Sequence, residues 1–183
     1  MSSVRQKVAL QFIVSNLALV ANFVLTIVLA RLLSPQDIGI FSMSAVLMAV
    51  AHVFRDFGVT SFIKREKELT PDSLSSALGV LLITSWSVAA LMFLSAPYWA
   101  HFFHEARVVP VVQVLALGFV FIPFGAIPMA IISREMDVKK SATIGAVATV
   151  VYFGASVGLA LAGFGPMTMA WANLVNIIVT GAM

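Results

Sequence analysis

Polar side chains recur on one side of an otherwise apolar segment near the N-terminus. When this segment is drawn as a helix, at 100° per residue, four side chains fall within about 60° of one another: Gln11, Ser15, Asn22 and Thr26. A similar stripe recurs nearer the C-terminus: Gly145, Thr149, Tyr152, Ser156 and Gly163. Amide and hydroxyl groups in such stripes either line a polar cavity or hydrogen-bond neighbouring helices. The spacing alone leaves both interpretations open for each stripe.

Two ionisable residues, Arg55 and Asp56, stand side by side late in another apolar run. They are interpreted either as a structural anchor at a membrane edge or as substrate contacts at the mouth of a cavity. His101 and His104 have a spacing that could share a metal ion, but no second cluster of ligands accompanies them. No nucleophile motif, phosphate-binding loop or carboxylate pair is present, so we expect no catalytic residue, no metal and no cofactor.

The amino-acid composition indicates whether water or lipid surrounds these residues. Of 183 residues, 61% are hydrophobic and 10% are charged, and the mean hydropathy is +1.03. Soluble domains are usually about 45–50% apolar and about 25% charged. The chain carries too few ionic groups to cover a surface in water, so we predict an integral membrane protein. The net charge of +3 comes from short loops, which argues against a nucleic-acid partner.

Six apolar runs could each form a helix that spans or enters a bilayer. They are Val8–Ala30, Ile38–Phe54, Leu78–Ala96, Val108–Ile132, Ala142–Ala162 and a last run from Thr168 to the end. We therefore predict an all-α bundle of six transmembrane helices. Pro123, Gly125 and Pro128 predict a kink in the fourth helix.

The basic residues alternate between the two sides of this bundle. The segments before, between and after the first five runs carry 2, 1, 4, 1, 3 and 0 lysines and arginines in turn. Because Lys and Arg concentrate on the cytoplasmic side, the N-terminus and the Lys64 and Lys139 loops are predicted to be cytoplasmic. The last run has 16 residues, or about 24 Å of helix, against a hydrocarbon core about 30 Å thick. No cationic stop follows, so we expect residues 1–183 to be a single lobe at the front of a longer protein.

Several segments resemble conserved elements of one transporter family. Residues 30–39, Ala-Arg-Leu-Leu-Ser-Pro-Gln-Asp-Ile-Gly, are similar to a signature that follows the first helix of bacterial polysaccharide flippases. Asp56-Phe57-Gly58-Val59 resembles their element after helix two. Two further segments resemble elements of this family in the same order. The first is Phe102-Phe103 with Pro110 to Leu117, and the second is residues 132–136, Ile-Ser-Arg-Glu-Met.

By this resemblance the chain is identified as the N-terminal lobe of a lipid-linked oligosaccharide flippase. The family belongs to the multidrug/oligosaccharidyl-lipid/polysaccharide exporter superfamily. The resemblance implies two six-helix lobes around a central cavity in the bacterial inner membrane. It also implies transfer of an undecaprenyl-diphosphate-linked glycan for O-antigen or exopolysaccharide biosynthesis, without enzymatic chemistry. The expected partners are this lipid-linked oligosaccharide, membrane lipids, and a C-terminal lobe or a second copy of the chain.

The same resemblance assigns roles to the polar residues. Arg31 and Arg55, with Asp56 beside it, become candidates for gating or for contact with an anionic headgroup, because a guanidinium binds oxygens in pairs. Residues Gln11, Ser15, Asn22 and Thr26 become candidates for a sugar-facing wall.

Two other classes remain as alternatives. A cation-coupled multidrug exporter would need an acidic residue deep in the membrane, whereas Asp56 lies near an edge. A membrane glycan polymerase or ligase would need a large outer loop, whereas the longest one here has about a dozen residues around His101.

Overall fold

The computed structural model describes residues 4–56, 71–134 and 137–183, and it describes only the backbone of residues 4–11, 55–56 and 71–72. Within this part every regular element is a helix, as predicted. The helices are α1 (Val4–Leu32), α2 (Pro35–Asp56), α4 (Pro71–Phe103), α5 (Val108–Arg134), α6 (Val138–Leu161) and α7 (Met167–Gly181).

Each predicted apolar run corresponds to one of these helices, which confirms a membrane-embedded helical bundle. Five of the described helices are long and apolar enough to cross a membrane, and α7 is shorter at 15 residues. The largest difference concerns α4, which was expected over Leu78–Ala96 and runs over 33 residues. Its ends carry serine, tyrosine and histidine, so hydropathy underestimates a helix that continues beyond its apolar centre. Thr70, which precedes Pro71 and Asp72 and is predicted from the sequence to be an N-cap, lies outside the described residues.

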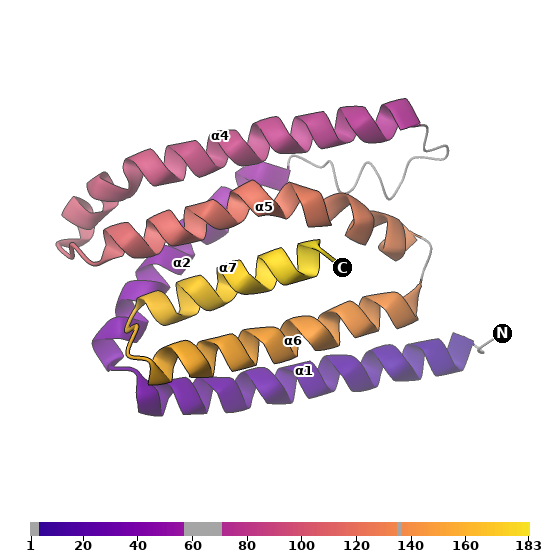
Figure 1. Ribbon diagram of the computed structural model, residues 1–183, viewed down its shortest axis with the longest axis horizontal. Coiled ribbons are helices and arrows are strands. Elements are labelled where there is room, and N and C mark those ends of the chain that lie inside the picture. The colour runs from indigo at the N-terminus through magenta and orange to yellow at the C-terminus, as the bar shows by residue number, and fades with distance from the viewer. Residues whose placement is uncertain (1–3, 57–70, 135–136) are drawn as a thin grey trace.

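Five helices lie roughly side by side in Figure 1, in the order α4, α5, α7, α6 and α1, while α2 crosses behind them. The α1–α2, α4–α5 and α6–α7 turns lie together at one end of the bundle. The start of α1, the end of α5 and the start of α6 lie at the other end. The predicted kink in α5 is confirmed, because this helix contains Pro123 and Pro128 and bends in its second half.

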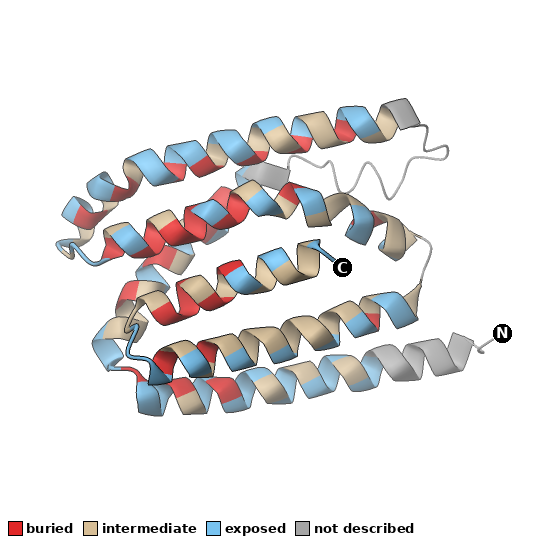
Figure 2. Cartoon of the chain, viewed as in Figure 1, coloured by how far each residue is buried: buried red, intermediate tan, exposed pale blue. Residues whose placement is uncertain are grey.

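The core is centred on α5. Its first half packs Val111, Val112 and Phe119 against α2, α4 and α7, and all three side chains are fully buried. By contrast, 11% of an apolar 18-residue window of α1 is buried, and the corresponding window of α6 has the same share. Figure 2 shows the buried residues concentrated around α5 and the start of α7. Large apolar side chains such as Phe12, Leu94 and Val150 stay exposed, which is the pattern expected where lipid is the solvent.

Specific caps set the turns at one end of the bundle. Ser34 precedes α2, its hydroxyl accepts from Asp37 N at 3.1 Å, and it donates to Asp37 Oδ2 at 2.6 Å. This is a reciprocal capping arrangement. Directly after α4, His104 takes φ 53°, and Glu105 N donates to Ala100 O at 3.0 Å. Gly163 and Gly165 take positive φ in the α6–α7 turn, where a side chain would be strained.

Candidate functional site

The side of α1 that packs within the lobe is apolar. Leu25 and Leu29 are buried against Ala160 of α6 and Met169 of α7, with Tyr152 packed beside them. At 100° per residue, Asn22 lies about 60° and Thr26 about 100° from Leu25 around the helix. The polar stripe therefore flanks the packing side of α1.

The described side chains of the α1 stripe are exposed. Ser15, Asn22 and Thr26 are all exposed within the lobe. The Asn22 amide donates to Ala18 O at 2.8 Å, and the Thr26 hydroxyl donates to Asn22 O at 2.9 Å. These bonds stay within α1, so neither group bonds α1 to another helix. Of Gln11 only the backbone is described, and it continues α1.

The α6 stripe has a different environment. Ser156 is fully buried, and Tyr152 packs against the leucines of α1. Thr149 donates to Gly145 O at 2.9 Å within its own helix. Most of this stripe lies inside the lobe, so the two stripes, which look alike in sequence, occupy different places.

Arg31 lies in the last turn of α1 and is exposed. It stands nine residues after Asn22, so it projects from the opposite side of the helix. Arg31 therefore lies at the end of the bundle where the three turns meet, on the side of α1 opposite the stripe.

Arg55 and Asp56 are the last two residues of α2, and only their backbone is described. In Figure 1 this end of α2 lies beside α4 and α5, whereas α1 lies at the opposite edge of the bundle. The fold therefore separates Arg55 from the α1 stripe. One turn before Arg55, the His52 ring packs against Phe119 of α5, with ring centroids 4.7 Å apart.

Sequence reasoning missed a group of residues that joins the three turns, here called the turn cluster: Gln36, Asp37, Glu105 and Arg107. Arg107 Nη1 lies 3.6 Å from Asp37 Oδ1, and Arg107 Nε donates to Glu105 Oε1 at 3.1 Å. Gln36 Nε2 donates to Glu105 Oε2 at 3.4 Å. A Cβ on Gly165 would lie 3.6 Å from Asp37 Oδ1, so the α6–α7 turn reaches the same carboxylate.

The charges of the turn cluster stabilise one another. The hydrogen bond from the Arg107 side chain lowers the pKa of the Glu105 carboxyl. The same bond raises the pKa of Arg107. The side chains keep part of their surface exposed, 17% for Asp37 and 45% for Arg107, so solvent weakens each ion pair. The cluster therefore positions the turns and is no enclosed binding pocket.

A signal for this cluster was present in the sequence. Ser34 and Asp37 have the spacing of a capping box, and Glu105 and Arg107 flank a single residue in a short turn. What the sequence could not show is that two turns separated by about seventy residues would share one arginine. His101 and His104 stack with ring centroids 6.2 Å apart, and within the described residues no third ligand joins them into a metal site.

Comparisons with known proteins identify the chain's relatives. Residues 28–183 match a family model described as polysaccharide biosynthesis protein. The lipopolysaccharide biosynthesis protein WzxC of Escherichia coli K12 is 27% identical over 142 residues, which cover 78% of this chain and 28% of that protein. An uncharacterized membrane protein in the cps region of Klebsiella pneumoniae is 26% identical over 130 residues, covering 65% of this chain and 24% of that protein. The chain thus spans about a quarter of the length of these relatives. No solved structure matches it.

Proposed function

Because the chain belongs to the polysaccharide biosynthesis protein family, we propose that it is the N-terminal lobe of a lipid-linked oligosaccharide flippase. Its cargo would be an undecaprenyl-diphosphate-linked glycan of the O-antigen or exopolysaccharide type. The protein would move this glycan across the bacterial inner membrane by alternating access, without covalent chemistry.

The exposed polar side of α1 is the observation that carries this proposal. Asn22 and Thr26 leave amide and hydroxyl groups on a surface that the rest of the lobe does not cover. Polar groups that face lipid are costly, so such a surface is favoured beside a water-filled cavity. Opposite a second lobe, Gln11, Ser15, Asn22 and Thr26 would form the wall along which the sugar moves. A C-terminal lobe of a longer chain, or a second copy of this one, would supply the facing wall.

The two arginines would act at opposite ends of this passage. Arg55, with Asp56 beside it, would receive the diphosphate at the cytoplasmic mouth, since a guanidinium binds paired oxygens. Arg31 would contact the headgroup or gate the passage at the outer rim, because it lies at the other end of the bundle. This arrangement takes the N-terminus as cytoplasmic, in accord with the alternation of basic residues.

Deletion of the gene in its own host tests the proposal. We expect surface polysaccharide to fall and lipid-linked oligosaccharide to accumulate in the cytoplasmic leaflet, out of reach of a periplasmic label. Accumulation in the outer leaflet would instead indicate a polymerase or ligase. Residues 1–183 joined to a second lobe should restore export, whereas residues 1–183 alone should not. Full restoration by residues 1–183 alone would favour a cavity built from two copies.

A further inference from the structure

Four aromatic side chains meet at the end of α4, and they are here called the aromatic group: Tyr98, Trp99, Phe102 and Phe103. Tyr98 and Phe102 each meet Trp99 edge to face, with ring centroids 5.7 Å and 6.2 Å apart. Phe103 stacks on Trp99 at 6.4 Å. Every other ring of the group therefore contacts Trp99, and these contacts hold the four rings as one unit.

The aromatic group has an exposed side and a packed side. Tyr98 and Phe102 are 69% and 61% exposed, and residues four apart share a helix face. Phe103 packs against the core around α5. Trp99 Nε1 donates to Ser95 Oγ at 3.2 Å, so the indole needs no acceptor outside α4. The outward surface of the group is therefore formed by the rings of Tyr98 and Phe102.

This outward surface continues a stripe of exposed leucines. Leu94 lies one turn before Tyr98, and Leu91 lies about one turn before Leu94, and both side chains are exposed. They belong to the apolar part of a helix that is long enough to cross a membrane. Aliphatic side chains exposed at this level face hydrocarbon. The same side of α4 thus changes from aliphatic to aromatic as the helix approaches its end.

Charged side chains begin directly beyond the aromatic group. Glu105 and Arg107 of the turn cluster follow shortly after Phe103, and charges are costly inside hydrocarbon. The aromatic group therefore lies between an aliphatic surface and a charged one. Tyrosine and tryptophan are enriched at this level of membrane proteins, where a ring with a polar edge suits the layer between hydrocarbon and water.

The length of α4 gives an independent check of this level. The helix has 33 residues, or about 50 Å, against a hydrocarbon core about 30 Å thick that takes about 20 residues. Counted back from Trp99, about 20 residues reach Gly79. The turns of α4 before Gly79 carry Ser73, Ser75 and Ser76, whose hydroxyls suit water or headgroups. One placement of α4 thus satisfies both boundaries.

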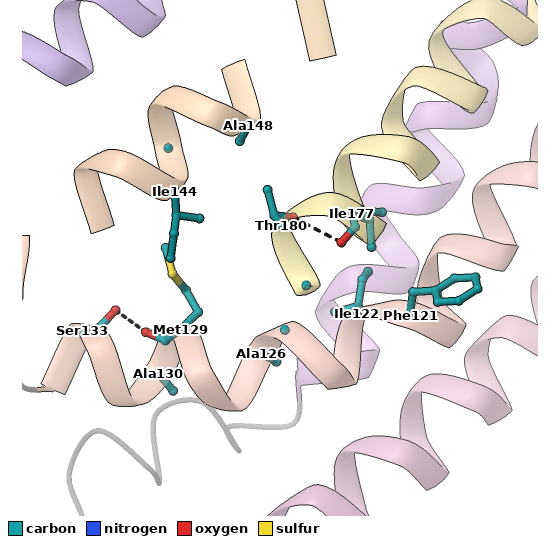
Figure 3. Close-up of a pocket in the computed structure, with 13 residues that line it drawn as sticks. Phe121, Ile122, Ala126, Met129, Ala130, Ser133, Ile144, Ala148, Ile177 and Thr180 are labelled. Carbon is teal, nitrogen blue, oxygen red and sulfur yellow. Dashed lines mark hydrogen bonds between the residues drawn. The ribbon is translucent and has the colours of Figure 1, made fainter. Parts of the chain in front are cut away.

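The other end of the bundle offers a contrast. The hollow drawn in Figure 3 lies between the second half of α5, the first half of α6 and α7. One aromatic side chain, Phe121, lines it, and its lining contains no tyrosine or tryptophan. Tyr98 and Trp99 therefore have no counterpart around that hollow.

We propose that the aromatic group anchors α4 in the headgroup layer of the lipid bilayer, at the end of the bundle that carries the turn cluster. Exposed rings could also stack on sugars. The lipid surface is favoured because Tyr98 and Phe102 continue the leucine stripe, and because α4 and α1 lie at opposite edges of the bundle. The anchor does not depend on the transport proposal.

Two native tryptophans of α4 serve as probes of depth. Trp86 precedes Trp99 by thirteen residues, or about 20 Å along the helix, and it is exposed. One variant keeps Trp99 alone, through Trp86→Phe and Trp171→Phe. The other keeps Trp86 alone, through Trp99→Phe and Trp171→Phe. Each is reconstituted in phosphatidylcholine vesicles whose acyl chains carry bromine at one chosen depth, because bromine quenches indole fluorescence on contact.

We expect bromine next to the headgroup to quench Trp99 about twofold or more better than bromine near the chain end. Trp86 should show the reverse order, because it lies close to the middle of the bilayer. Stronger quenching of Trp99 by the deep bromine would overturn the proposal. So would quenching of Trp99 from no depth, which is the result expected if sugar or another protein covers the group.

A change of bilayer thickness separates an anchor from a ring that merely lies at this level. Between short-chain and long-chain phosphatidylcholine, Trp99 should keep its depth below the headgroups. Tyr98→Leu combined with Phe102→Leu should abolish this constancy, whereas Phe93→Leu, at an exposed position nearer the middle of α4, should preserve it. The same constancy after the double change, or its equal loss in the control, would show that the aromatic group is no anchor.

Discussion

Arg107 Nη1, in the turn just before α5, lies 3.6 Å from Asp37 Oδ1 in the first turn of α2. The same aspartate accepts from the Ser34 hydroxyl at 2.6 Å, so one carboxylate both caps α2 and ties it to α5. The α6–α7 turn approaches this carboxylate through Gly165. Parts of three turns far apart in sequence therefore lie close to Asp37.

The cap contributes more to stability than the exposed ion pair does. Ser34→Ala removes the acceptor for Asp37 N and should lower the free energy of unfolding by about 0.5–2 kcal/mol. Arg107→Ala should have a smaller effect, because solvent weakens the pair. Ser42→Ala, which loses a bond to Ile38 O inside α2, serves as the control and should change little. Thermal unfolding in detergent measures all three. An effect of Arg107→Ala larger than that of Ser34→Ala would contradict this ranking.

The Glu105–Arg107 contact should give stability a defined pH dependence. The pKa of Glu105 is lower in the folded chain than its ordinary value of 4.5, chiefly because Arg107 hydrogen-bonds its carboxylate. This contribution is present above pH 4.5 and is lost as the pH falls through the lower folded pKa. The difference in melting temperature between the unmodified chain and Glu105→Gln should stay constant from neutral pH to about 4.5, then shrink. A difference that grows on acidification would contradict the sign.

Three glycines should respond differently to alanine because their surroundings differ. A Cβ at Gly125 would lie 2.9 Å from the backbone of Gly181, and one at Gly118 would lie 2.9 Å from the end of the Ile177 side chain. Backbone cannot move aside cheaply, so Gly125→Ala should destabilise by about 1–3 kcal/mol. Gly118→Ala should be nearly neutral, because Ile177 can adjust. Gly145→Ala meets open space and should stabilise by about 0.5–1 kcal/mol. The order of melting temperatures tests the α5–α7 packing.

The proposed orientation can be measured directly because the chain contains no cysteine. A single cysteine introduced between residues 163 and 167 should react with an impermeant reagent added outside intact spheroplasts. A cysteine at Lys139 should react only after the membrane is opened. The expectation follows from the larger number of lysines and arginines on the Lys139 side. Labelling of position 139 from outside would show the inverse orientation.

Much of the fold was predictable from the sequence, because a run of apolar residues in a membrane has helix as its main option. The positions of α1, α5 and α6 followed from hydropathy, and the kink in α5 followed from its prolines. The ends of α4 did not, since its polar residues continue the helix beyond the apolar run.

The candidate site was only partly predictable. Periodicity grouped Asn22 with Thr26 and grouped Thr149 with Ser156, but it cannot tell which group a neighbouring helix will cover. In the structure Ser156 is buried and Asn22 is exposed. The turn cluster depends on contacts between distant turns, which no local pattern contains.

We propose above that the exposed polar side of α1 lines the path of the glycan. Asn16 and Asn22 are both exposed, and each donates to a carbonyl four residues earlier, at 2.7 Å and 2.8 Å. They lie about 120° apart around α1, so they form a matched pair. The most direct measurement compares surface polysaccharide with protein abundance for Asn22→Leu and Asn16→Leu in the full-length protein. We expect Asn22→Leu to reduce export severalfold at unchanged protein abundance. Adding Thr26→Val to Asn22→Leu should reduce export further. Asn16→Leu should leave export intact. Equal export by the two variants at equal abundance would contradict the assignment of this side of α1 to the glycan path.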